Sequence, residues 1–446
     1  MSLNQHIKGS LDLGNPLMSY TCTVHKPNSN VEYYEAYKNI GRKYTRIAYG
    51  TNASMVIQAA IDALGTTGGK IFVKAGSYIL NSPLDLLDKE NIIIKGEGRD
   101  YEKVKGTILK AKNGLNDHMI KIKGTGVYGR QVNITIRDLS LSGNGGNQNA
   151  GDAINVDGAT LGLHLKNLMI ANVYRHAIYM NNIEVSRLQN IFCMGNQATG
   201  QSLIYLANSH GNYLEDIEVT GAKGAGIYLY VSSNNTFVDA HTYLNTHNGL
   251  YIYNRCKRNT FLSGGSWNNQ REGVEINSEG IANIFVGFKA YDNAQDGVAR
   301  AGFKVRNNVG NPSLNNIFLG CLAYDDQGVK TQDYGYHEAE ATDYSLLIGC
   351  DFTGNQVGAV GTIVGANTKF KNVLGYVTES SGTATISAST TVTFNHGLAG
   401  TPTHVGCGFK TTGYGSWIWS ADATNITITV AVSGTYDLTW DAEYKP

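Results

Sequence analysis

The sequence has few charged residues and no long apolar run. Lys, Arg, Asp and Glu make up 16% of the chain, and 36 basic residues balance 36 acidic ones. A nucleic-acid partner requires a basic surface, so this balance argues against one, although a local basic cluster is still compatible with it. No stretch reaches the roughly 18 apolar residues that a membrane helix needs. The composition therefore predicts neither a nucleic-acid partner nor a membrane partner.

The N-terminus and the cysteines lack the motifs that would assign them a role. The opening residues, MSLNQHIKGSLDLGNPLMSYT, contain no basic region followed by an apolar core, so no secretory signal is visible. A virion protein released by cell lysis needs no such signal, and we expect an extracellular or virion-associated location. The six cysteines form no C-x-x-C pair, which gives no indication of a zinc or redox motif.

Short apolar segments recur from residue 151 onward. They read DAINVD, HAIYMN, SLIYLA, AGIYLY, NGLYIY, EGVEIN, AGFKVR and YGYHEA, and their aligned apolar positions lie 23 to 33 residues apart. A second series with a similar period reads NNTFVD, RNTFLS, ANIFVG and NNIFLG. Each segment alternates apolar and polar residues, which is the pattern of a half-buried strand. Because no such unit can bury its apolar face alone, the units are expected to stack into a solenoid.

An amphipathic segment precedes these repeats. Residues 54–64, SMVIQAAIDAL, have helical periodicity, and strand-like segments follow them. The run IQAAIDAL…GGKIFVKAGSYIL resembles the opening of the pectate-lyase-like superfamily, in which a helix caps the first coil. The resemblance covers about residues 45–370 and implies an all-β fold, a single-stranded right-handed parallel β-helix. It implies little about activity, because the superfamily includes lyases, hydrolases, epimerases and viral tailspike-type polysaccharide depolymerases.

The composition changes near residue 377, where the chain becomes rich in Thr and Ser. This texture resembles the small C-terminal β domains of viral tail proteins and carbohydrate-active proteins. We expect an N-terminal extension over residues 1–45, a parallel β-helix over 46–376 and a small β-sandwich-like domain over 377–446. The tryptophans of the last part are expected to form its core, with a sugar-binding surface or an oligomerisation contact as the alternative: Trp417, Trp419 and Trp440.

Side-chain alternation along the predicted strands places six tyrosines on one outward surface. They are Tyr179, Tyr205, Tyr228 and Tyr251 in one column, with Tyr230 and Tyr253 beside it. Stacked tyrosines can stabilise a solenoid without any ligand. A broad exposed aromatic surface, however, marks a binding site, and rings that carry a hydroxyl group suit the faces of sugars. We therefore expect a long polysaccharide as the partner.

Charged residues follow the tyrosines in the next coils. Glu275, Lys304, Arg306 and His337 occupy outward positions on successive strands, and Glu275 with Lys304 could simply form a surface salt bridge. The loops before Lys304 and His337 are five residues longer than their counterparts, and enlarged loops on a regular scaffold are where sites are built. These loops carry five charged residues to the wall of the expected cleft: Asp292, Asp296, Arg300, Asp325 and Asp326.

Two kinds of cleavage fit these residues. A glycoside hydrolase needs two carboxylates, which Glu275 and Asp296 or Asp326 could supply, or Glu272 if the chain bends at Gly273. A lyase acting on an acidic polysaccharide needs a base and a cation. Lys304, Arg306, His337 and Tyr251 suit those roles, with the loop aspartates as candidate Ca²⁺ ligands.

The sequence favours an enzyme but leaves lyase and hydrolase open. The alternative is a non-catalytic viral receptor-binding spike or surface adhesin that recognises a glycan, and a tailspike would be expected to form a homotrimer. If the charged cluster is not the catalytic centre, the next candidates are Asp152, His176 and Asn155.

Overall fold

The structure is a computed structural model that describes residues 20–27, 32–40, 43–99, 105–124, 133–298, 300–308 and 311–446. The first 19 residues of the predicted N-terminal extension lie outside this description. The described chain divides into two compact units, Met1–His247 and Asn248–Pro446, called unit 1 and unit 2 below. The predicted boundaries after residues 45 and 376 stay predictions.

Unit 1 begins with an antiparallel cap. Strand β1 (Cys22–His25) pairs with β2 (Tyr34–Ile40), and β2 pairs with β3 (Lys43–Gly50). The predicted helix forms as α1 (Ala53–Asp62), close to the expected residues 54–64, and one side of it is buried. The side chain of Asn52 accepts a hydrogen bond from the backbone nitrogen of Met55 at 3.3 Å, which caps the first turn. In the described part of the chain no helix has the length and apolar character of a membrane span.

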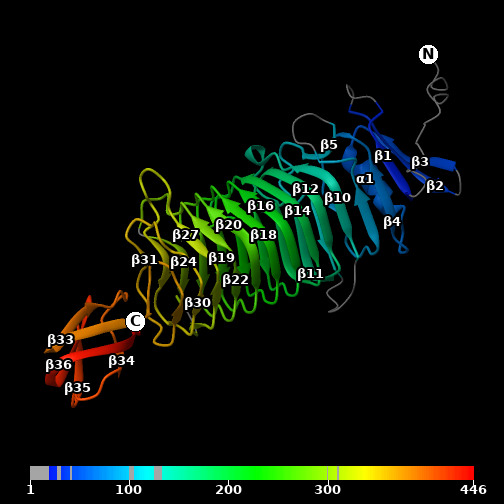
Figure 1. Cartoon of the computed structure of the whole chain (residues 1–446). Coiled ribbons are helices and arrows are strands. Elements are labelled where there is room, and N and C mark those ends of the chain that lie inside the picture. The colour runs from blue at the N-terminus through cyan, green and yellow to red at the C-terminus, as the bar shows by residue number, and fades with distance from the viewer. Residues whose placement is uncertain are drawn as a thin grey trace, which may run out of the picture. The chain divides into compact units, whose positions relative to one another are not determined.

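The rest of unit 1 consists of stacked coils that contribute to two parallel sheets (Figure 1). The first, here called the short-strand sheet, contains β6 (Leu84–Asp85), β9 (Ile120–Lys123), β11 (Ile154–Leu161), β13 (Ile178–Glu184), β15 (Ile204–Ala207) and β17 (Ile227–Tyr230). The second, here called the long-strand sheet, contains β4 (Gly69–Val73), β5 (Gly76–Leu80), β7 (Ile92–Lys95), β8 (Thr107–Ala111), β10 (Thr135–Ser142), β12 (His164–Val173), β14 (Arg187–Asn196), β16 (Tyr213–Thr220) and β18 (Thr236–Tyr243). A short 3₁₀ helix, η3 (Gly145–Asn147), lies between β10 and β11.

Unit 2 repeats the same coil. Its short-strand sheet contains β19 (Leu250–Tyr253), β21 (Val274–Asn277), β24 (Ala301–Arg306), β28 (Tyr334–Glu338) and β31 (Gly358–Val360). Its long-strand sheet contains β20 (Thr260–Trp267), β22 (Ile284–Val286), β23 (Lys289–Tyr291), β26 (Ile317–Leu319), β27 (Leu322–Tyr324), β30 (Leu346–Ile348) and β32 (Lys369–Lys371). A small pair is formed by β25 (Ser313–Leu314) and β29 (Thr342–Asp343).

The register confirms the predicted repeat. In unit 1, Ile154, Ile178, Ile204 and Ile227 pair in succession on neighbouring strands. In unit 2, the aligned positions also pair in succession: Leu250, Val274, Phe303 and Tyr336. All these side chains are buried. A one-residue slip of a strand would turn all its apolar side chains out of the core, so their burial fixes the register. The apolar alternation therefore fixes which side chains point outward.

Buried asparagines hold the turns of the coils together. In unit 2 the amide nitrogen of Asn259 donates to Asn283 at 3.0 Å, and that of Asn283 donates to Asn316 at 3.1 Å. In unit 1 Asn212 donates to Asn235 in the same way. These asparagines are nearly or fully buried, so their amides satisfy one another and the adjacent backbone rather than a ligand.

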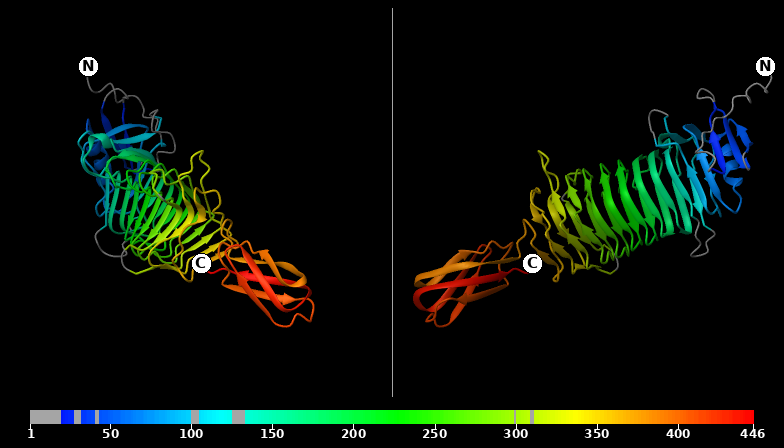
Figure 2. Two further views of the ribbon diagram at one scale, coloured as in Figure 1. Left: turned by 90° about the vertical axis from the view of Figure 1, so that its left-hand side faces the viewer. Right: turned by 45° about the vertical axis from the view of Figure 1, so that its right-hand side comes forward.

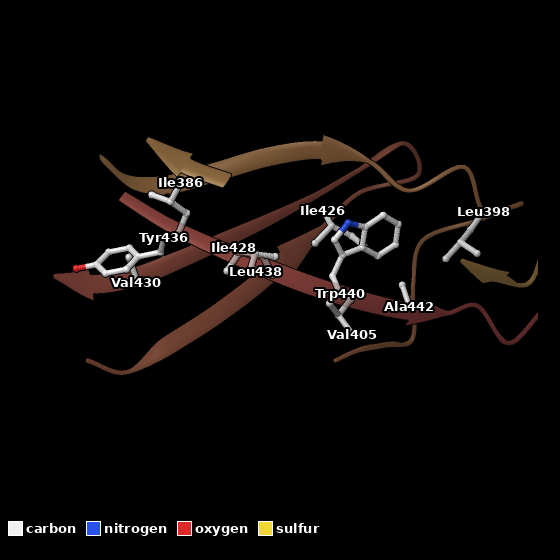
Figure 3. Packing of buried hydrophobic residues seen from close by; sticks show 10 residues of the cluster. All are labelled: Ile386, Leu398, Val405, Ile426, Ile428, Val430, Tyr436, Leu438, Trp440 and Ala442. Atoms are coloured by element: carbon white, nitrogen blue, oxygen red, sulfur yellow. The ribbon is translucent and has the colours of Figure 1, made fainter. Parts of the chain in front are cut away.

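The C-terminal part of unit 2 is a small antiparallel sheet. Two long strands, β33 (Glu379–Asn395) and β36 (Asn425–Glu443), pair along their length, with register shifts near Ser389. Strand β34 (His404–Phe409) pairs with one half of β36, and β35 (Trp417–Ala421) pairs with the other half. Figure 3 shows the apolar side chains that these strands bury, among them Ile428, Leu438 and Trp440.

The prediction that the tryptophans form this core is only partly correct. Trp440 is 8% exposed, and Trp417 packs against the same core. Trp419 is 38% exposed, so its placement in the core was wrong. It lies on β35 between Trp417 and Ala421, both of which pack against the core.

Candidate functional site

Three of the predicted tyrosines line a pocket on the outward side of the short-strand sheet in unit 1. Tyr179, Tyr205 and Tyr228 pair in register on β13, β15 and β17 and are partly exposed. The rings of Tyr179 and Tyr205 are parallel with centroids 5.5 Å apart, whereas Tyr228 meets Tyr205 edge to face at 4.8 Å. The pocket has a volume of about 340 Å³, and Arg175, His176 and Gln201 also line it.

His176 lies at the base of this pocket and is 4% exposed. Its ring centroid lies 5.6 Å from that of Tyr179 and 5.3 Å from that of Tyr205. The Nδ1 atom lies 2.6 Å from the carbonyl oxygen of Ser202, which can only accept a hydrogen bond. Nδ1 therefore carries the proton, and Nε2 of the neutral ring keeps its lone pair. Burial lowers the pKa of His176, and this effect outweighs the opposing influence of Asp152, so the ring is neutral at neutral pH.

Asp152 organises the polar groups around the pocket. Its carboxylate accepts hydrogen bonds from Nε of Arg175 at 3.1 Å, the backbone nitrogen of His176 at 3.1 Å and the amide nitrogen of Asn155 at 2.9 Å. The Nδ1 atom of His118 lies 3.1 Å from the same carboxylate. Burial alone would raise the pKa of Asp152, but His118, His176 and Arg175 lower it to about 2, so the group is ionised.

Part of this constellation was predicted from the sequence and part was missed. Asp152, His176 and Asn155 were the second-choice candidates, and the structure brings all three together. Arg175 and Ser202 were missed because strict alternation was assumed from each apolar anchor. A polar residue two positions before the anchor, as in DAI, HAI and SLI, is a signal that finds Ser202. Arg175 lies three positions before its anchor Ile178, and this signal does not find it.

The catalytic cluster predicted from the sequence lies in unit 2. Glu275 is 4% exposed, because other side chains cover it. Its carboxylate accepts hydrogen bonds from Nε of Arg306 at 2.6 Å and the amide nitrogens of Asn248 at 2.7 Å and Asn277 at 3.1 Å. Because Glu275 is buried, the expectation that it faces solvent was wrong. Burial and the nearby Glu275 charge raise the pKa of Tyr251, so its hydroxyl stays protonated.

Lys304 pairs with Glu272 rather than with Glu275. Its Nζ lies 3.1 Å from the carboxylate of Glu272, so the alternative of a Glu275–Lys304 surface salt bridge is not what the structure shows. Arg300 bridges two carboxylates: its Nη1 lies 3.4 Å from Oε1 of Glu272, and its Nη2 lies 2.9 Å from Oδ2 of Asp296. Burial would raise the pKa of Asp296, but hydrogen bonds from Arg300 and the backbone lower it overall. Glu272 reaches this outward group because β21 begins only at Val274, beyond Gly273.

His337 lies beside these charges. Its Nδ1 accepts a hydrogen bond from the backbone nitrogen of Thr362 at 3.1 Å, which leaves the proton on Nε2 when the ring is neutral. Burial and then the charge of Lys304 lower the pKa of His337. The two tyrosines predicted beside the main column are partly exposed as well. Tyr253 stacks against Tyr251 at 5.4 Å, and Tyr230 occupies the last position of β17.

The loop aspartates do not form the predicted Ca²⁺ site. Oδ1 of Asp292 accepts a hydrogen bond from the backbone nitrogen of Asp326, and Asp325 accepts three from backbone nitrogens of its own loop. Burial, and then the neighbouring Asp326 and Asp325, raise the pKa of Asp292 to about 6. Within the described ranges no group of three or more His, Cys, Asp or Glu residues is arranged to hold a metal ion. The donor set therefore does not fit Ca²⁺.

Known proteins support the architecture. A family model described as the right handed beta helix region matches residues 123–309. The A-module of mannuronan C-5 epimerase AlgE4 from Azotobacter vinelandii is 19% identical with a TM-score of 0.52, covering 72% of this chain and 96% of its own. The AlgE6 A-module of the same organism is also 19% identical, with a TM-score of 0.53 and coverage of 72% and 95%.

A third structure, DFA-IIIase from Arthrobacter chlorophenolicus A6 in complex with GF2, is 11% identical with a TM-score of 0.52. It covers 71% of this chain and 90% of its own. No curated protein matches the sequence. The chain is a right-handed parallel β-helix protein, as its resemblance to the pectate-lyase-like superfamily implied.

Proposed function

We propose that this protein binds a long acidic polysaccharide on the outward side of its short-strand sheet and cleaves it as a lyase. The observation that carries this proposal is the pocket of unit 1, where a neutral His176 with an unprotonated Nε2 lies against the rings of Tyr179 and Tyr205 and shares the pocket wall with Arg175. This set combines a base, a cation and apolar ring surface. The mannuronan epimerases of the same fold support a uronate polymer as the class of substrate.

Around the tyrosine pocket and the Glu272 and Glu275 cluster, the charges favour a lyase over a hydrolase. A glycoside hydrolase needs one protonated carboxylic acid beside a carboxylate. Asp152, with a pKa of about 2, is ionised, and Glu272 and Glu275 each contact a cation at 3.1 Å or less. The same cations suit an anionic sugar. Removal of a proton next to a carboxylate requires that the developing charge be stabilised, which a guanidinium does.

The pocket residues can be assigned to the steps of β-elimination. Arg175 is 40% exposed along its side chain and binds Asp152 through Nε and Nη2, so it offers its remaining guanidinium nitrogen to the uronate carboxylate. Nε2 of His176 accepts the proton from C5, the electron pair forms the C4–C5 double bond, and the C4–oxygen bond breaks. The leaving oxygen takes a proton from a tyrosine hydroxyl. Burial, together with Asp157 and Asp152, raises the pKa of Tyr179, so its phenol is protonated and can serve as this acid.

The cluster of unit 2 has a second role in this proposal. In the resting protein, Arg306 is paired with Glu275 and Lys304 with Glu272. We assign Glu275, Lys304, Arg306, His337 and Asp296 to a further uronate site, in which the cations exchange their protein carboxylates for those of the polymer. The Arg306–Glu275 and Lys304–Glu272 pairs also support the alternative function, a glycan-binding spike or adhesin without catalysis. A protein that only binds a glycan needs no free base, so its carboxylates can all be paired with cations.

Incubation with a panel of polysaccharides tests the function. Polygalacturonate, alginate and hyaluronan represent acidic polymers, and a neutral glucan is the control. We expect an acidic polymer to yield ultraviolet absorbance of unsaturated uronate in step with new reducing ends. Reducing ends without unsaturation would show a hydrolase. Retention of an acidic polymer with no product would show the binding-only alternative, and inversion at C5 without cleavage would show an epimerase.

A further inference from the structure

A second surface of unit 1 is strongly basic, although the whole chain has no net charge. It lies on the outward side of the long-strand sheet, whereas the tyrosine pocket lies on the short-strand sheet. Strands β7, β10, β12 and β14 pair in succession there. Figure 1 labels the last three, and Figure 2 shows the row of parallel strands to which they belong. Six basic residues on this sheet, here called the basic face, are Lys70, Lys95, Arg137, His164, Lys166 and Arg187.

The strand register gathers these residues into two adjacent columns. Lys95, Arg137 and Lys166 are direct neighbours on three successive strands. His164 and Arg187 are direct neighbours in the second column, two residues earlier along each strand. Because parallel strands lie about 4.8 Å apart, the cations recur at a regular, short interval. All six residues are at least partly exposed, with the side chain of Arg137 38% exposed and that of Arg187 52% exposed.

Acidic neighbours neutralise only part of this charge. Arg187 pairs with Glu215 at 3.0 Å, and Arg137 lies 3.8 Å from Asp138. Lys70, Lys95 and Lys166 form no ion pair with any residue in the described part of the chain. The basic face therefore keeps several uncompensated cations next to one another, an arrangement that costs stability unless an anion occupies it.

The pKa of His164 shows that the cations of the basic face repel one another. Its pKa is lowered by burial and then by the charges of Lys166 on its own strand, Arg187 on β14 and Arg137 on β10. Its Nε2 is buried and has no hydrogen-bond partner among the described residues. The four basic groups are thus close enough to repel one another, and a polyanion laid across them would relieve that repulsion.

We propose that the basic face is a second binding track for the acidic polysaccharide, separate from the tyrosine pocket. The class of ligand rests on the proposed function, while the track itself rests on the strand register and the charges. A polymer with one carboxylate per sugar presents anions at regular intervals, as the strands present cations. Such a track holds a long chain on the protein between successive encounters with the pocket, because two sites on one polymer raise its effective concentration.

Paired variants separate this track from the pocket. Lys95→Ala/Lys166→Ala removes two cations that form no ion pair within the described ranges, although Lys95 Nζ also lies 5.9 Å from the centre of the Phe72 ring. Lys369→Ala/Lys371→Ala removes two exposed lysines from β32 of the other unit and serves as the control of equal charge. Titration calorimetry measures the affinity for long polygalacturonate or alginate at two salt concentrations. Lys95→Gln/Lys166→Gln keeps the side-chain stems in case the alanines perturb the fold.

We expect the Lys95/Lys166 variant to bind the long polymer at least fivefold more weakly, with a shallower salt dependence. The control should bind like the unmodified protein. Turnover of a four-sugar oligomer should be unchanged in both, and His176→Ala should lose turnover but keep the track. Loss of turnover in every protein tested would count against the proposed function alone. Equal weakening by the control, unchanged binding by both basic-face variants, or tighter binding of duplex DNA than of the polyuronate would overturn the track.

Discussion

Replacing His176 by alanine should reduce elimination by about a hundredfold to ten-thousandfold, the range expected for loss of a general base. The protein should stay folded, because among the described residues the ring makes one side-chain hydrogen bond, to the Ser202 carbonyl. Substrate affinity should change little, since the tyrosines and Arg175 remain. Steady-state rates on an acidic polymer measure the effect, and His404→Ala on β34, an exposed histidine, is the matched control.

The pH profile provides a second readout for His176. Its pKa is lowered from the ordinary value of 6.5, so the basic ring is present above the lowered pKa and is lost as the pH falls through it. The rate should therefore rise with pH to a plateau reached below neutrality. Near-normal turnover in His176→Ala, combined with loss of turnover in Glu275→Gln or Lys304→Ala, would place the catalytic centre in unit 2 and contradict this assignment.

Replacing Tyr205 and Tyr228 together by alanine should weaken binding of a long oligouronate more than tenfold, which corresponds to about 1.4 kcal/mol or more. These two rings meet edge to face at 4.8 Å and form one wall of the pocket. The melting temperature should fall only slightly, because outward residues contribute modest cross-strand packing. Calorimetric titration and thermal unfolding measure the two effects separately.

Phenylalanine variants at the same positions divide the effect between ring and hydroxyl. Tyr205→Phe/Tyr228→Phe should keep most of the affinity, because the ring surface remains. A large loss of thermal stability in the alanine variant, with unchanged binding, would show that the tyrosines are only a structural ladder. That outcome would remove the main reason for placing a sugar in this pocket.

The repeat could be predicted from the sequence because one physical rule sets it. Alternating apolar residues must all point inward, so Ile154, Ile178, Ile204 and Ile227 had to pair in register, and they do. The same rule placed Tyr179 and Tyr205 on the outward side. It could not give their ring orientations, which depend on local packing rather than on alternation.

The charged site could be predicted only in part, because alternation does not hold where a strand begins. Glu272 and His176 precede their strands, and the backbone there turns their side chains toward the outward groups. The sequence also could not predict which carboxylate Lys304 pairs with. Glu275 and Glu272 were both possible partners, and in the structure the partner is Glu272. The cover over Glu275 comes partly from Asn248, a residue 27 positions away in sequence.

The most direct test of the central claim is a crystal structure of the His176→Ala variant with a bound oligouronate. The account predicts a uronate in the tyrosine pocket, with its carboxylate on Arg175 and its C5 hydrogen directed at the space vacated by the imidazole. Tyr179 should lie within hydrogen-bond distance of the glycosidic oxygen. An oligouronate bound only at Lys304 and Arg306, with the tyrosine pocket empty, would contradict the account.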